Sequence, residues 1–295
     1  MLGCPVLAAL ALVLAQFNLE LPWALDLGTH WVLPAGVGLL GLSLFGSRLE
    51  RVASLAGAAA CLVLAIAAEP NAPPASPGSK QLKMVLSNVL STNANPDLFL
   101  QWLAQEKPEI VGVLEVDAAW ADKLSGLPEY PYQRVFPRFD NFGIALLSKH
   151  PLELAPEFEG VDLVPSITAL VNVPEGPPLR VVLLHPVTPS KPEGHFARNE
   201  QLRRLGASFG GYSGPSVMLG DFNASPWSSP MRILENRGLQ RVTGSDPTWP
   251  TLGVFPGVLP LDQVLVNRQV LGASAEVGPN VGSDHRPVLV RLQLR

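Results

Sequence analysis

Charged side chains are distributed very unevenly along this chain, and no other feature of the sequence constrains its fold as strongly. Residues 1–79 contain two basic and four acidic side chains, whereas residues 80–295 contain 19 basic and 21 acidic ones. Soluble domains carry about 25% charged residues, but this chain carries 16%. We therefore expect part of the N-terminal segment to face lipid rather than water.

Three apolar runs in this segment are each long enough for a spanning helix, which needs roughly 17–25 residues. They are Met1–Leu19, Leu27–Ser47 and Val52–Ala68. The sequence thus predicts a membrane anchor of about three transmembrane helices over residues 1–68. Two alternatives stay open, namely a cleaved signal peptide for the first run and a buried helix for the third.

The charges in the two short connections predict an orientation for the anchor. Arg48 and Arg51 lie between the second and third runs, whereas residues 20–26 contain only acidic charges. Basic connections tend to stay in the cytoplasm. We therefore expect a multi-pass protein of the inner or cell membrane, with everything after Ala68 facing the periplasm or exterior.

A proline-rich segment separates this anchor from a soluble domain. Residues 69–79, EPNAPPASPGS, contain four prolines, which exclude regular helix and predict an irregular linker. Residues 80–295 are enough for one large domain with a full core. Both cysteines, Cys4 and Cys61, precede that domain, so a thiolate zinc site there is excluded. Its balanced charge also excludes a strongly basic nucleic-acid scaffold.

The soluble domain alternates strand-like and helix-like segments. Residues 81–89 and 109–115 read as strands around a helix over 95–105, with Asn95 as N-cap and Pro96 at the first position. Such a unit predicts parallel strands. Further strands are expected at 132–136, 142–148, 167–173, 179–184, 216–220, 262–266 and 288–294, and helices at 197–209 and 230–236. The pattern predicts an α/β fold with two packed sheets and outer helices.

Polar side chains recur where these apolar strands begin or end, and ligands bind at such strand ends in open sheets. They are Asn88, Glu115, His185, Asp221, Asn223, Asp262, Asp284 and His285. Carboxylate and amide oxygens suit Mg²⁺ or Mn²⁺, and the histidines are acid–base groups. The remaining histidines, His30, His150 and His195, are expected in loops.

Two of these clusters resemble known family motifs. Gly220-Asp221-Phe222-Asn223, followed by Ser283-Asp284-His285, resembles the endonuclease/exonuclease/phosphatase superfamily of metal-dependent phosphohydrolases with a deoxyribonuclease-I-like fold. Leu114-Glu115 is similar to that family's Gln-Glu motif, with Leu in place of Gln. Residues 141–148 are similar to its glycine-containing strand, while Gln263 stands where Tyr or His is common. The resemblance covers residues 80–295 and implies a two-sheet α-β-β-α sandwich.

The resemblance also implies residue roles. Asn88, Glu115 and Asp284 would bind Mg²⁺ or Mn²⁺. His285 would be the general base, supported by Asp262, while Asp221 and Asn223 would orient water and phosphate, and His185 would donate to the phosphate.

The expected activity is that of a metal-dependent, nuclease-like phosphodiesterase outside the cytoplasm, acting on nucleic acid, a nucleotide or a lipid headgroup. The alternatives are a headgroup phosphodiesterase, a phosphomonoesterase or a non-catalytic tethered binding protein; no protein partner is expected. A basic patch would favour nucleic acid, and Trp227 and Trp249 are candidates to stack a base. Residues 252–261 are expected to border the site. The candidate patch is Lys191, Arg198, Arg203, Arg204, Arg232, Arg237 and Arg241.

Overall fold

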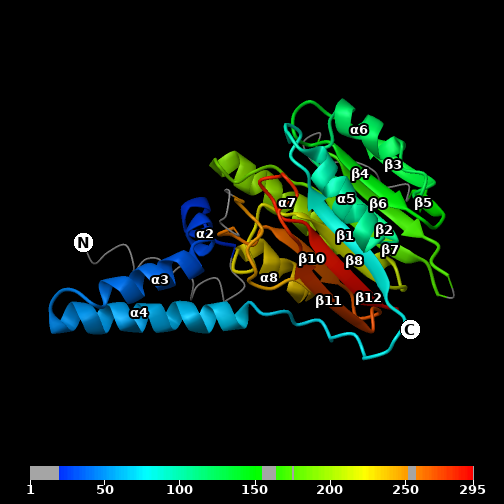
Figure 1. The fold of residues 1–295 in the computed structure, drawn as a ribbon. Helices are drawn as coiled ribbons and strands as arrows, with labels where there is room; N and C mark the ends of the chain where they lie inside the picture. The colour runs from blue at the N-terminus through cyan, green and yellow to red at the C-terminus, as the bar shows by residue number, and fades with distance from the viewer. Residues whose placement is uncertain (1–19, 155–163, 175, 252–256, 295) are drawn as a thin grey trace.

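Two six-stranded mixed sheets pack face to face in the computed structural model, which describes residues 20–154, 164–174, 176–251 and 257–294 (Figure 1). The first sheet has the order β11-β12-β1-β2-β4-β3 and the second the order β5-β6-β7-β8-β10-β9. The strands of the first sheet are β1 (Leu82–Asn88), β2 (Ile110–Leu114), β3 (Tyr132–Phe136), β4 (Ile144–Ser148), β11 (Gly272–Val277) and β12 (Val288–Gln293). Those of the second are β5 (Leu152–Leu154), β6 (Ser166–Val171), β7 (Leu179–Leu184), β8 (Ser216–Asp221), β9 (Gln240–Arg241) and β10 (Asp262–Val266).

Helices cover the outer face of each sheet. They are α5 (Pro96–Glu106) and α6 (Ala118–Ser125) on the first sheet, and α7 (Pro192–Ser208) and α8 (Ser229–Asn236) on the second. A short 3₁₀ turn, η2 (Phe209–Gly211), follows α7. The expected two-sheet sandwich with outer helices is therefore confirmed.

The apolar core lies between the sheets because each strand alternates its side chains between two faces. Leu86 of β1 and Ile110 of β2 point inward with Leu183 of β7 and Leu219 of β8, and all four are fully buried. Neighbouring residues point outward and are buried under the helices. Both faces are thus covered, which explains why these strands read as continuous apolar runs.

The predicted strand–helix–strand unit is present. β1 and β2 are parallel, with Asn88 opposite Leu114. The helix between them begins at Pro96, but the Asn95 side chain makes no capping hydrogen bond. Sequence reasoning missed α6, β5, β9 and β11, because these elements are short or carry little apolar periodicity.

The prediction of three transmembrane helices is not supported. The first run lies outside the described residues. The second is divided between α2 (Trp23–Thr29) and α3 (Val32–Leu42), and an 11-residue helix is only about 16 Å long. The third forms α4 (Arg48–Ala67), the one helix among the described residues that is long and apolar enough to cross a membrane. In Figure 1, α3 and α4 project together away from the sandwich.

The proline-rich segment is irregular, as predicted, but it is docked on the domain. The backbone N–H groups of Asn71 and Ala72 donate to the Arg241 carbonyl, and the Ala273 N–H donates to the Pro73 carbonyl. Since these bonds tie the segment to β9 and β11, it does not span solvent as a free tether.

Candidate active site

The strand ends of both sheets bring the predicted site residues together. Asn88 ends β1 and Glu115 follows β2, while Asp221 ends β8 and His185 follows β7. β7 and β8 are also parallel, so each sheet presents a pair of carboxyl ends. Asp262 begins the antiparallel β10 directly opposite Asp221. All five are buried.

One carboxylate oxygen, Oδ2 of Asp221, is the point on which these side chains converge. His185 Nε2 and His285 Nε2 each lie 3.5 Å from it. The Asn88 amide nitrogen lies 3.4 Å from the same oxygen. Two imidazoles and an amide, drawn from both sheets, therefore surround a single buried carboxylate.

His285 is fixed by a second carboxylate. Its Nδ1 lies 2.8 Å from Asp262 Oδ2, which orients Nε2 towards Asp221. Burial opposes the charged imidazolium, but the carboxylates of Asp262 and Asp221 outweigh it and raise the pKa of His285 to about 10. The pair is thus a carboxylate–imidazole dyad in which the carboxylate sets the ring orientation and favours the charged form.

Glu115 provides a feature that suits a cation. Its Oε1 accepts a hydrogen bond from Asn88 Nδ2 at 2.9 Å, whereas its Oε2 is buried with no hydrogen-bond partner among the described residues. Asp284 lines the same cavity, but its Oδ2 accepts from Trp249 Nε1 at 3.1 Å. Within the described ranges, no group of three His, Cys, Asp or Glu side chains is arranged to hold a metal. The unpaired oxygen of Glu115 still fits a hard cation.

Backbone strain is concentrated at this site. Glu115, Asn141 and Asn223 line the cavity in the left-handed region, with φ of 61°, 65° and 49°. Side chains with a Cβ rarely adopt it, and residues held there cluster at functional sites. Asn223 is held by its N–H, which donates to Asp221 Oδ1 at 2.9 Å, and by its amide, which donates to the Pro186 carbonyl at 3.0 Å.

A cavity of about 470 Å³ opens over these residues. Its polar lining includes all the predicted site residues except Asn88 and Asp262, which lie behind Glu115 and His285. Sequence reasoning missed Asp140, Leu27, His30 and Trp31, which also line it. Among the described lining residues there is no Lys or Arg.

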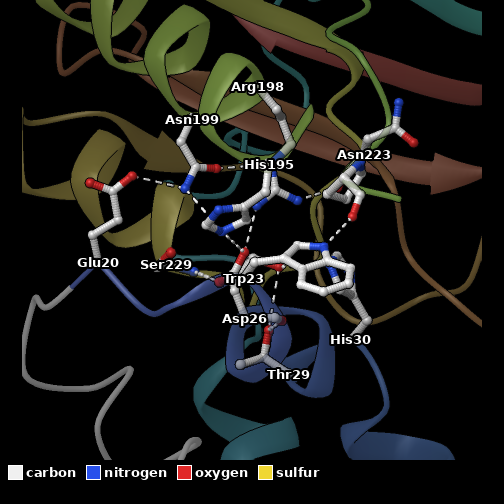
Figure 2. A network of polar contacts seen from close by, with 12 residues as sticks. Glu20, Trp23, Asp26, Thr29, His30, His195, Arg198, Asn199, Asn223 and Ser229 are labelled. Carbon is white, nitrogen blue, oxygen red and sulfur yellow. Dashed lines mark hydrogen bonds and ion pairs between the residues drawn. The ribbon is translucent and has the colours of Figure 1, made fainter. Parts of the chain in front are cut away.

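The last three of these missed residues come from the N-terminal segment, which a buried ion pair fixes to the domain (Figure 2). Asp26 of α2 pairs with Arg198 of α7 at 2.5 Å and also contacts His195 Nε2 at 3.1 Å. Arg198 in turn donates to the Asn223 carbonyl at 2.6 Å. No local pattern could reveal a pair separated by 172 residues in sequence.

The expectation that the other histidines lie in loops is wrong for His195 and confirmed for His30 and His150. His195 lies within α7 and is buried. His30 is buried between α2 and α3, and its burial, together with the charge of Arg198, lowers its pKa to about 4. His150 follows β4 and contacts Glu109 at 2.7 Å.

The prediction that the basic residues form a single exposed patch is also wrong. Arg198 and Arg241 are buried. Three of the other arginines form ion pairs, Arg203 and Arg204 with Glu200 and Arg232 with Glu235, which also binds Arg241. Trp227 is buried and donates to the Leu64 carbonyl of α4 at 2.9 Å, so it is not placed to stack a base. Trp249, Leu259 and Leu261 line the cavity; residues 252–256 lie outside the described ranges.

Solved structures share this architecture. Beta toxin of Staphylococcus aureus superposes with a TM-score of 0.57 and 20% identity, covering 71% of this chain and 99% of that one. D. rerio TDP2, complexed with a single-strand DNA product, superposes with a TM-score of 0.58 and 15% identity, covering 72% of this chain and 99% of that one. The 3′ phosphatase NExo from Neisseria, bound to a product DNA hairpin, superposes with a TM-score of 0.56 and 18% identity, covering 72% of this chain and 99% of that one. These likenesses show the fold.

Sequence comparison places the chain more narrowly. A UPF0294 protein of Klebsiella pneumoniae (strain 342) is 32% identical over 197 residues, which cover 63% of this chain and 68% of that protein. Residues 85–285 match the model of the endonuclease/exonuclease/phosphatase family. The fold and the family together define a hydrolase of phosphoesters. The chain belongs to the endonuclease/exonuclease/phosphatase family.

Proposed function

We propose that this protein is a divalent-metal-dependent phosphodiesterase that acts outside the cytoplasm. The observation that carries the proposal is the dyad of His285 and Asp262 facing Asp221, with His185 on the other side of the same carboxylate oxygen. Phosphoester hydrolysis needs a group that takes a proton from water and donors that stabilise the phosphoryl oxygens.

The charge of the cavity favours a phosphodiester over a phosphomonoester. A diester carries one negative charge, whereas a monoester carries close to two at neutral pH. Since no described lining residue is Lys or Arg, the bound cation alone would have to balance a second phosphate charge in addition to the neighbouring carboxylates. The same argument disfavours a nucleic acid, whose neighbouring phosphates require several basic contacts.

In the proposed mechanism, His285 takes the proton of the attacking water through Nε2. Asp262 binds Nδ1–H, fixes the tautomer and stabilises the imidazolium that forms. His185 and Asn223 donate to the phosphoryl oxygens, and Asp221 orients the water. In the cation-free chain two carboxylates favour the charged His285, so the base form requires that the charge of Asp221 be offset.

Glu115, with its unpaired Oε2, is the residue we expect to hold Mg²⁺ or Mn²⁺, together with Asp284 and the oxygen of Asn88. A bound divalent cation supplies positive charge that offsets the phosphoryl oxygens and the neighbouring carboxylates. We expect chelation to abolish activity and either cation to restore it.

Hydrolysis of bis(4-nitrophenyl) phosphate by the detergent-solubilised full chain tests the activity. The His285→Ala variant should lower kcat by about 10² or more, because the proton acceptor is lost. His150→Ala is the matched control, since His150 contacts Glu109 outside the cavity, and its kcat should stay near wild type.

Full activity in excess chelator, or wild-type turnover in His285→Ala, would contradict the mechanism. The same assay with 4-nitrophenyl phosphate, plasmid DNA, RNA and phospholipid vesicles decides among the remaining substrate classes. No hydrolysis of any of them would favour the non-catalytic binding protein.

A further inference from the structure

The lining of the catalytic cavity has two chemically different parts. One part is the set of acids, amides and histidines described above. The other is apolar and includes Leu27, Trp31, Trp249, Leu259 and Leu261. Such side chains hold a phosphate poorly, so the second part requires a different portion of the ligand.

We propose that Leu27 and Trp31, together with Leu259, form a subsite for an apolar substituent of the phosphodiester. The substrate is then amphiphilic, with its phosphate at Asp221 and His285 and its apolar group against α2 and the start of α3. This inference rests on the proposed function for the position of the phosphate, but it assigns a specificity role to the N-terminal segment.

The wall formed by Leu27 and Trp31 is held rigidly. Asp26, directly before Leu27, accepts from Arg198, and from the Ser229 N–H at 2.8 Å. Trp23 Nε1 donates to the Pro189 carbonyl at 2.7 Å, and Pro189 itself lines the cavity. A preformed wall requires little ordering when an apolar group binds, which favours affinity.

The wall also carries no charge. His30, between Leu27 and Trp31 in the lining, is neutral at physiological pH because its pKa is lowered to about 4. Trp31 lines the cavity and is 53% exposed, so more than half of its surface is accessible to a ligand. A bound apolar group would cover its exposed surface.

The position of the wall relates the subsite to the apolar hairpin formed by α3 and α4. α3 begins at Val32, directly after Trp31. Leu40, Leu44 and Ile66 of this hairpin region are all more than half exposed. An amphiphile that approaches along this apolar surface reaches Trp31 first, so both a membrane lipid and a free amphiphilic ester fit the chemistry.

Binding of two non-hydrolysable monoanions, dimethylphosphinate and butyl(methyl)phosphinate, tests the subsite in the full chain with Mg²⁺. Each buried CH₂ contributes roughly fourfold in affinity, so we expect the butyl compound to bind at least about tenfold tighter. Trp31→Ala should reduce this ratio severalfold, whereas Trp31→Phe should retain most of it. Phe45→Ala is the control, because Phe45 is 71% exposed outside the cavity.

Equal affinities of the wild-type chain for the two phosphinates would overturn the subsite, even if diester hydrolysis is intact. An unchanged ratio in Trp31→Ala would do the same. Because the affinity ratio is measured without turnover, it can still be determined if the protein does not hydrolyse diesters. Failure of the subsite and failure of the proposed activity are therefore distinguishable. Cleavage of phospholipid vesicles would assign the substituent to a membrane lipid, and cleavage of 4-nitrophenyl butyl phosphate alone to a free ester; both support the subsite.

Discussion

His285 shows how one side chain acquires its properties from neighbours that are distant in sequence. The ring is buried, which alone would favour the neutral form. It nevertheless lies between Asp262 and Asp221, which belong to adjacent antiparallel strands and face each other in the register. The sheet thereby places two negative charges on one imidazole.

Removing the Asp262 charge should lower the pKa of His285. In the cation-free wild-type chain, histidine-selective NMR should give a pKa of about 10, and Asp262→Asn should move it downward because the largest raising contribution is lost. Since the folded pKa is raised, this pair stabilises the fold fully below pH 6.5 and progressively less as pH rises through about 10.

The free energy of unfolding of wild type should therefore exceed that of Asp262→Asn at pH 6 by more than it does at pH 10.5. Urea unfolding of the two cation-free proteins at both pH values measures this difference. A gap that widens as pH rises would show that the imidazole is not charged in the folded chain.

At the scale of secondary-structure elements, the contact between α2 and α7 joins the N-terminal segment to the catalytic site. Burial alone would raise the pKa of Asp26, but the hydrogen bond from His195 and the charge of Arg198 hold it well below its usual range. Arg198, fully buried, also binds the carbonyl of Asn223. A displacement of α2 would move Arg198 and thereby disturb the backbone of Asn223, which lines the cavity in the left-handed region.

Neutralising Asp26 should destabilise the protein strongly. Asp26→Asn leaves Arg198 buried without a counter-charge, an arrangement that costs about 3–5 kcal/mol. Glu276→Gln is the matched control, because Glu276 pairs with Arg291 and its side chain is 69% exposed, and exposed pairs contribute about 1 kcal/mol or less. Urea unfolding at pH 7 measures both; equal effects would show that the Asp26 pair is not structurally important.

The sequence was sufficient to predict the sandwich and the residues at its strand ends, because buried strands and polar termini leave local patterns. Leu179–Leu184 and Asp262–Val266 are strands at the predicted bounds. The second apolar run was misread because hydropathy does not distinguish a spanning helix from short helices on a domain. The roles of Asp26, His195 and Trp31 could not be predicted for a different reason, since each depends on contacts with residues far along the chain.

At the scale of the whole molecule, the two ends of the α3–α4 hairpin differ, because one end lies at the sandwich and the other projects away from it. Because α2 packs on the sandwich, the segments before α3 and after α4 lie on the same side. The far end of the hairpin carries Arg48 and Arg51 at the start of α4. We propose that this end faces the cytoplasm, because basic residues favour that side of a membrane. The crossing between α2 and Arg48 then needs α3 together with residues 43–47, since α3 alone is only about 16 Å long.

Reporter fusions test this orientation. Alkaline phosphatase, which matures only outside the cytoplasm, should be active when fused after Arg295. Fused after Ser47, at the far end of the hairpin, the same enzyme should be inactive while a cytoplasmic fluorescent reporter is bright. The reverse pattern would place the catalytic domain in the cytoplasm.

The separation between Asp26 and Arg198 also sets an order of events during synthesis. Ribosomes add about 5–20 residues per second, so Asp26 emerges about 10–30 s before its partner across the intervening 172 residues. β1, moreover, pairs with β12, which lies about 200 residues further along the described chain. The first sheet therefore stays open until β12 has been synthesised, and α2 must remain available until α7 has emerged. A nascent chain held at the membrane by α4 would keep α2 close to the sandwich that it later completes.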